Sequence, residues 1–157
     1  TLLGTEALAQ AALLHYRERF AEVGLFENEV YAGIEDVLAA LKADGRRLFV
    51  ATSKPHVYAE RIIRHFGLDE YFDRVFGAEL DGTRAAKTDL LAYALAQTRT
   101  DPAQALMIGD RSHDIIGARN NAMAAVGVLY GYGSREELLG AGAERLCATP
   151  QELREHA

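Results

Sequence analysis

The side chains best suited to chemistry in this sequence stand just after short apolar runs. Thr52-Ser53-Lys54 follows the apolar run at residues 48–51, and Asp110 follows the run at residues 105–108 with one glycine between them. Continuous apolar runs of this length are typical of parallel strands that are buried on both faces. Ligands of parallel sheets bind beyond the carboxyl ends of the strands. These polar groups are therefore expected to meet at one edge of one sheet.

Two carboxylates, Asp110 and Asp114, lie four residues apart, and Gly109 precedes the first of them. A carboxylate directly after a buried strand, with a second one at the start of a helix, suits a hard cation such as Mg²⁺, which takes oxygen ligands and keeps several waters. The alternative is that Asp110 only begins a turn and that Asp114 only caps the next helix. An isolated Gly-Asp pair favours this capping interpretation. Together with the other polar segments, the pair favours a metal site in which Asp110 and Asp114 are the candidate residues.

The segment Thr52-Ser53-Lys54 combines hydroxyl groups, a cation and open backbone N–H groups at a point where a strand leads into a helix. This combination predicts a phosphate-binding site, because helix N-termini and successive backbone N–H groups attract anions. Ser53 is also a candidate N-cap for the helix that begins at Pro55, and the two roles are compatible.

A further cation, Lys87, stands ahead of a helical pattern. A lone lysine is usually a solvated surface charge. However, a phosphate beside a metal and a carboxylate nucleophile needs a cation that offsets the repulsion between like charges. The residues alone leave Lys54, Lys87 and Arg111 open for this role.

Two kinds of apolar pattern alternate along the chain. Short continuous runs predict strands, and apolar residues at spacings of three and four predict helices. Their alternation predicts an α/β fold in which right-handed βαβ units build a parallel sheet flanked by helices. Strands are expected at residues 48–51, 75–77, 105–108, 125–129 and 146–148, and helices at residues 6–23, 34–41, 55–66, 89–97, 115–123, 135–139 and 150–156.

The composition restricts the class of protein and of partner. The 157 residues are 49% hydrophobic and 25% charged, as in ordinary soluble globular proteins. A net charge of −6 argues against a surface that neutralises a nucleic-acid backbone, so small molecules are the expected partners. Cys147 is the only cysteine, so no intrachain disulfide forms, and no apolar run approaches the roughly 20 residues that span a bilayer. We expect a cytoplasmic protein with no nucleic-acid or membrane partner, and its oligomeric state is not predicted.

The polar segments occur in the order that is found in haloacid dehalogenase-type (HAD) hydrolases. The strand that ends in Thr52-Ser53, then Lys87, and then Gly109-Asp110 with Asp114 resemble the second, third and fourth sequence motifs of that superfamily. Longer stretches are similar to its phosphoglycolate phosphatase-type members, namely Val30-Tyr31-Ala32-Gly33-Ile34, Ala51-Thr52-Ser53-Lys54-Pro55, Leu80-Asp81-Gly82-Thr83-Arg84, Ile108-Gly109-Asp110-Arg111 and Gly127-Val128-Leu129-Tyr130-Gly131-Tyr132-Gly133.

The resemblance implies a Rossmann-like core, an α-helical cap, and Mg²⁺-dependent hydrolysis of a phosphomonoester through an aspartyl-phosphate. It assigns residues 1–30 to part of the cap and residues 31–157 to the core. Thr52 would hydrogen-bond the phosphoryl oxygens, with Ser53 and Lys54 beside it in the phosphate site. Lys87 would steady the nucleophile and the phosphate. Asp110 would ligate Mg²⁺, and Asp114 would support the metal site.

The first motif of the superfamily, an aspartate pair at the end of the first core strand, is not found in this sequence. The chain opens on Thr1 directly into a helical pattern, so we expect that an N-terminal segment is missing and that this chain alone is inactive. Glu79-Leu80-Asp81-Gly82-Thr83 imitates the Asp-x-Asp-Gly-Thr pattern of that motif. However, Glu79 would place its carboxylate wrongly, and the segment follows the Thr52 strand, where the motif should precede it. Asp81-Gly82 predicts a tight turn instead.

The expected substrate is a small phosphorylated metabolite such as 2-phosphoglycolate. Alternatives on the same scaffold are a 5′-nucleotidase-like or other HAD phosphatase, a phosphonate-cleaving enzyme and a phosphomutase. An alternative from a different class is a non-catalytic fragment that binds phosphate or metal, or a subunit that another chain completes.

Overall fold

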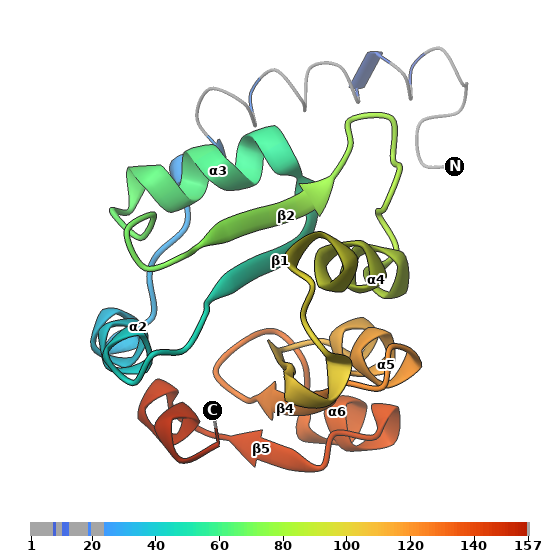
Figure 1. The fold of residues 1–157 in the computed structure, drawn as a ribbon. Helices are drawn as coiled ribbons and strands as arrows, with labels where there is room; N and C mark the ends of the chain where they lie inside the picture. The colour runs from blue at the N-terminus through green and yellow to red at the C-terminus, as the bar shows by residue number, and fades with distance from the viewer. Residues whose placement is uncertain (1–7, 9–10, 13–18, 20–23, 157) are drawn as a thin grey trace.

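The computed structural model describes residues 8, 11, 12, 19 and 24–156 (Figure 1). Most of the helix predicted over residues 6–23 lies outside the described residues, so the division into a cap and a core stays a prediction. Within the described residues, no helix is long and apolar enough to cross a lipid bilayer. The elements are η1 (Gly24–Phe26), α2 (Ile34–Ala43), β1 (Phe49–Pro55), α3 (His56–His65), β2 (Arg74–Ala78), α4 (Lys87–Thr98), η2 (Pro102–Gln104), β3 (Leu106–Gly109), α5 (Ser112–Asn120), β4 (Ala124–Val128), α6 (Arg135–Ala141), β5 (Arg145–Cys147) and η3 (Pro150–Glu155).

All strand pairs in the described residues are parallel, as the alternation of strands and helices predicts. The strands form two sheets, however, and not the single sheet expected. One sheet has the order β1-β2 and the other has the order β3-β4-β5. The inner strands of the two sheets, β1 and β3, are not hydrogen-bonded to each other, and Figure 1 shows the two sheets one above the other.

The β3-β4-β5 sheet is buried on both faces, which explains its continuous apolar runs. Met107, Ala125 and Leu146 pack into a cluster with residues of α5 and α6. Their sequence neighbours Ile108, Val126 and Cys147 pack into a second cluster with residues of α2 and η3. Successive side chains of a strand point to opposite faces, so each strand contributes to both clusters.

Helix α4 connects the two sheets. It packs against β1 and β2, and it also packs against α5, which covers β3 and β4. Helix α3 lies on the other side of the β1-β2 pair (Figure 1). The N-terminus of α4 therefore lies where the ends of β1 and β3 approach each other.

Most elements begin or end one or two residues away from the sequence-based expectation, and β1, α5 and the C-terminal segment differ most clearly. Strand β1 continues to Pro55, because Pro55 keeps an extended backbone with φ −53° and ψ 134°. Helix α5 begins at Ser112, earlier than the expected residue 115, because the Asp114 side chain accepts a hydrogen bond from the backbone N–H of the N-cap residue, Arg111. The C-terminal segment, for which a helix over residues 150–156 was expected, forms a 3-10 helix, η3, over Pro150–Glu155.

Candidate active site

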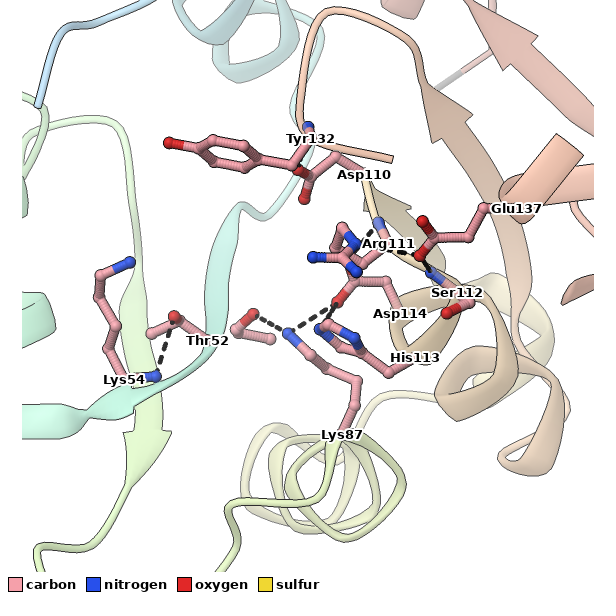
Figure 2. Close-up of polar contacts among 11 residues, drawn as sticks. Thr52, Lys54, Lys87, Asp110, Arg111, Ser112, His113, Asp114, Tyr132 and Glu137 are labelled. Carbon is pink, nitrogen blue, oxygen red and sulfur yellow. Dashed lines mark hydrogen bonds and ion pairs between the residues drawn. The ribbon is translucent and has the colours of Figure 1, made fainter. Parts of the chain in front are cut away.

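All six side chains that the sequence predicts for the site line one cavity of about 450 Å³. Residues of the inner strands β1 and β3 line the same cavity, which lies between the carboxyl ends of these strands (Figure 2). The convergence that the sequence predicts is thus present, while the chemical role of each residue stays a prediction. The six side chains are Thr52, Ser53, Lys54, Lys87, Asp110 and Asp114.

Lys87 is a buried cation and not the solvated surface charge that a lone lysine usually is. It is the first residue of α4 and is 7% exposed. Its Nζ donates to the backbone oxygen of Ala51 at 2.7 Å and lies 2.9 Å from Oδ1 of Asp114. An ammonium group has three N–H donors. Two are engaged by these contacts, so the third can serve an anion in the cavity.

Asp114 caps the next helix, which is one of the two roles that the sequence leaves open, and it also pairs with Lys87. Its Oδ2 accepts a hydrogen bond from the Arg111 backbone N–H at 3.1 Å, which caps the start of α5, while Oδ1 pairs with Lys87. Asp114 is 4% exposed, and a Cβ atom at Gly109 would lie 2.3 Å from its Cβ, so only glycine permits this approach. With both oxygens engaged by protein donors, Asp114 is better suited to hold Lys87 and the Asp110 loop than to ligate a metal directly.

Asp110 is held by the loop that follows β4. Its Oδ2 accepts from the backbone N–H of Tyr132 at 2.8 Å. A Cβ atom at Gly131 would lie 2.3 Å from the Cβ of Asp110, and one at Gly133 would lie 2.0 Å from its backbone oxygen. The residue pattern alone did not indicate that this loop takes part in the site. Glycines and a backbone N–H group give the loop this role, and the repeated Tyr-Gly pattern at residues 130–133 was the signal in the sequence.

The Thr52 hydroxyl accepts a hydrogen bond from the Lys54 backbone N–H at 3.2 Å. The hydroxyl keeps its own hydrogen as a donor to an anion in the cavity. The expectation that Ser53 caps the next helix is wrong. The N-cap of α3 is Pro55, with no side-chain cap, because β1 continues past Ser53 and keeps it away from the first N–H groups of the helix. The Lys54 side chain extends on the far side of Thr52 from Lys87 (Figure 2).

A carboxylate that the sequence analysis missed, Glu137, holds the start of α5. Its Oε1 accepts from the Ser112 backbone N–H at 2.8 Å and from Nε of Arg111 at 3.0 Å. These donors, first the backbone N–H of Ser112 and then Arg111, lower the pKa of Glu137 to about 2. His113, which is 53% exposed, has its Nε2 3.7 Å from Oδ1 of Asp114. Only the fold could reveal Glu137, because it comes from α6, 25 residues after Ser112.

The segment that imitates the missing first motif forms a turn, as the sequence predicts. Oδ1 of Asp81 accepts from the Thr83 backbone N–H at 2.8 Å, and Gly82 has a φ of 91°. The Glu79 side chain pairs with Arg84. None of these residues lines the cavity.

Comparisons with known proteins agree with this geometry. The model of the family described as haloacid dehalogenase-like hydrolase matches residues 4–128. The chain is 47% identical over 150 residues to a 5′-nucleotidase of Pseudomonas aeruginosa. The aligned residues make up 96% of the chain and 68% of that protein. It is 44% identical over 131 residues to the tyrosine-protein kinase PtkA of Mycobacterium tuberculosis. The aligned residues make up 83% of the chain and 45% of that protein. The chain therefore belongs to the haloacid dehalogenase-like hydrolases.

Solved structures confirm the predicted fold class. The crystal structure of a predicted phosphatase from Clostridium acetobutylicum matches with a TM-score of 0.91 and 44% sequence identity, over 96% of this chain and 70% of that one. The structure of PtkA from Mycobacterium tuberculosis matches with a TM-score of 0.80 and 40% identity, over the same shares of the two chains. The fold is thus the Rossmann-like α/β fold of the family, and the chain covers only part of the length of these relatives.

Proposed function

We propose that the complete protein is a Mg²⁺-dependent hydrolase of small phosphomonoesters. The observation that carries this proposal is the buried pair of Lys87 and Asp114, which points a cation into a cavity that Asp110 and Thr52 also line. A buried cation beside carboxylates and a hydroxyl suits a phosphate, because fixed donors in a site with little water stabilise an anion strongly.

The nucleophile, in this proposal, is an aspartate on a further strand between β1 and β3. Each of these strands is paired on one side only within the described residues. Backbone groups at the edge of a buried strand need hydrogen-bond partners, and an additional parallel strand would supply them and join the two sheets. The carboxyl end of that strand would lie beside Lys87 and Asp110, because the ends of parallel strands meet at the same edge.

The reaction then has two displacements. The aspartate carboxylate attacks phosphorus, the ester P–O bond breaks, and the departing alcohol oxygen takes a proton from a second acid. Water afterwards attacks the acyl-phosphate and releases phosphate and the free carboxylate. Thr52 donates its hydroxyl hydrogen to a phosphoryl oxygen, and the remaining N–H of Lys87 bonds to the phosphate or to the attacking carboxylate.

Asp110 would hold the metal. Mg²⁺ is commonly bound by one or two carboxylates together with phosphate oxygens and water, so a full protein cage is not needed. Among the described residues, no group of three or more histidine, cysteine or acidic side chains is placed to hold a metal ion. The bound cation would neutralise negative charge on the phosphate as the nucleophile approaches.

The proposed substrate is a small phosphorylated metabolite such as 2-phosphoglycolate. A nucleoside 5′-monophosphate is the second candidate, and two observations favour it. The Pseudomonas relative is named a 5′-nucleotidase, and two tyrosines at the cavity, Tyr31 and Tyr132, are 45% and 88% exposed. Exposed aromatic rings can stack against a base. A comparison of kcat/KM for both substrate types, with Mg²⁺ present, separates these candidates.

The test of the activity is the substitution Asp110→Asn in the complete protein. Loss of a carboxylate ligand to the metal removes several kcal/mol of transition-state stabilisation, which is about a thousandfold in kcat/KM. Asp69→Asn, which changes an exposed carboxylate away from the cavity, is the matched control and should leave the rate unchanged. Parent-like turnover by the Asp110 variant would disprove the proposed metal site, and absence of turnover in the parent would favour a non-catalytic binding protein.

A further inference from the structure

Helix α5 contacts the first turn of α4 through residues that lie on one of its faces. Asp114, Gly117 and the C-cap residue Asn121 follow one another at spacings of three and four residues, which places them on the same side of a helix. The two helices pack side by side (Figure 1). Because α4 begins at Lys87, this face of α5 adjoins the buried cation of the cavity.

Gly117 allows the close approach of the Lys87 side chain. A Cβ atom at Gly117 would lie 2.8 Å from Cγ of Lys87, 3.1 Å from its Cβ and 3.1 Å from its backbone carbonyl carbon. The lysine stem cannot swing away freely, because its Nζ donates to the backbone oxygen of Ala51 at 2.7 Å and lies 2.9 Å from Oδ1 of Asp114. A side chain at residue 117 would therefore push the start of α4 away from α5.

Asn121 binds the backbone of α4 one residue after Lys87. Its Nδ2 donates to the backbone oxygen of Thr88 at 3.0 Å and to the backbone oxygen of Gly117 at 2.8 Å. The side-chain amide nitrogen carries two hydrogens, so both bonds form at once. Asn120 adds a more exposed bond, from its Nδ2 to the Thr88 hydroxyl at 3.1 Å. The first turn of α4 is thus tied to the end of α5 by side-chain amides.

We propose that Asn121 and Gly117 are positioning residues that place the Lys87 ammonium group for binding of the substrate's phosphate. This inference rests on the proposed function, since it assumes that the phosphate binds at Lys87. Neither positioning residue lines the cavity, so an effect on phosphate binding has to act through the lysine. A cation that its surroundings hold in place stabilises an anion more strongly, because it does not have to reorganise when the anion binds.

The experiment measures the binding of inorganic phosphate to the complete protein and to its Asn121→Ala variant, with Mg²⁺ present. Phosphate is titrated in thermal unfolding, because a ligand that binds the folded state raises Tm according to its dissociation constant. Each protein is compared with its own phosphate-free Tm, so a loss of stability and a loss of binding are measured separately. A hydrogen bond between charged groups changes affinity by about ten- to a hundredfold. A displaced ammonium group loses part of this, so the phosphate dissociation constant of Asn121→Ala should rise by about three- to tenfold.

A second variant and a matched control separate positioning from stability. Gly117→Ala introduces a better helix former, yet it should weaken phosphate binding as Asn121→Ala does, because the new Cβ displaces the lysine stem. The control is Arg119→Gln, because Nη1 of Arg119 donates to the backbone oxygen of Ala141 at 3.0 Å and so ties α5 to α6 instead of α4. This control should lower Tm and leave the phosphate dissociation constant within about twofold of the parent's, within the scatter of contact energies.

A double-variant cycle shows whether the effect passes through the lysine. In Lys87→Met no ammonium group remains to be positioned, so adding Asn121→Ala to it should weaken phosphate binding no further. A parent-like phosphate affinity of Asn121→Ala would overturn the inference, and so would a further loss of affinity in the double variant. Failure of the proposed function is distinguishable, because it appears as a lack of Mg²⁺-dependent hydrolysis by the parent, whereas phosphate binding requires no hydrolysis.

Discussion

The buried pair of Lys87 and Asp114 allows a quantitative prediction for the substitution Lys87→Met. Both side chains are 6% exposed, and Nζ lies 2.9 Å from Oδ1. Methionine has a similar length but no charge, so the variant keeps most of the packing and leaves the Asp114 carboxylate buried without its cation. Removing one partner of a buried ion pair costs about 3–5 kcal/mol. In a domain of this size each kcal/mol lowers Tm by roughly 2–4 °C, so the expected decrease is roughly 6–20 °C.

The assay is urea and thermal unfolding of the complete protein, followed by circular dichroism. Lys42→Met is the matched control, because Lys42 pairs with Asp73 at 3.3 Å on the surface, where the side chains are 35% and 37% exposed. Exposed pairs contribute at most about 1 kcal/mol, so this control should change Tm little. The double variant Lys87→Met/Asp114→Asn should be less destabilised than the sum of its single variants, because no unpaired carboxylate remains. If Lys87→Met and Lys42→Met destabilise equally, the inferred burial of the pair is wrong.

Two further predictions concern the loops that hold the site. The pKa of Glu137 is lowered from 4.5 to about 2, so its contribution to folding is complete above about pH 4.5 and is lost as the pH falls through 2. Unfolding free energies from urea titrations between pH 5 and 2 should therefore fall less steeply for Glu137→Gln than for the parent, and parallel curves would contradict the assigned contacts. A Cβ atom at Gly131 would lie 2.3 Å from Cβ of Asp110, so Gly131→Ala should raise the Mg²⁺ concentration needed for half-maximal activity. Gly140→Ala has open space around the new atom and should leave that concentration unchanged, so an equal effect of both would count against the Asp110 assignment.

The sequence predicts the strands and the meeting of the polar residues because both follow from local patterns. Continuous apolar runs mark the strands, and the expectation that the carboxyl ends of parallel strands lie at one edge brings Thr52 and Asp110 close together. The residue pattern also favours a turn at Asp81-Gly82, which the structure contains. These inferences need only the order of residues along the chain.

The contacts that hold the site could not be predicted in the same way. Glu137 reaches Ser112 from another helix, and Tyr132 contributes only its backbone N–H, which any residue other than proline possesses. The failed prediction at Ser53 has a similar origin. The residue type fits an N-cap, but the extra length of β1 is a property of its pairing with β2, where Thr52 is paired with Gly77 and Pro55 with Ala78. Tertiary pairing thus overrode a local preference.

The two sheets also explain why one lysine matters to both halves of the site. Thr52 belongs to β1, and Asp110 follows β3, yet no backbone hydrogen bond connects these strands in the described residues. Lys87 bonds to the backbone of Ala51 in β1 and to Asp114 in α5, so it spans the boundary between the sheets. The spacing between the Thr52 hydroxyl, proposed to bind phosphate, and the proposed metal ligand is therefore set partly by this side chain. Lys87→Met should consequently reduce activity through the geometry of the site as well as through the loss of a positive charge.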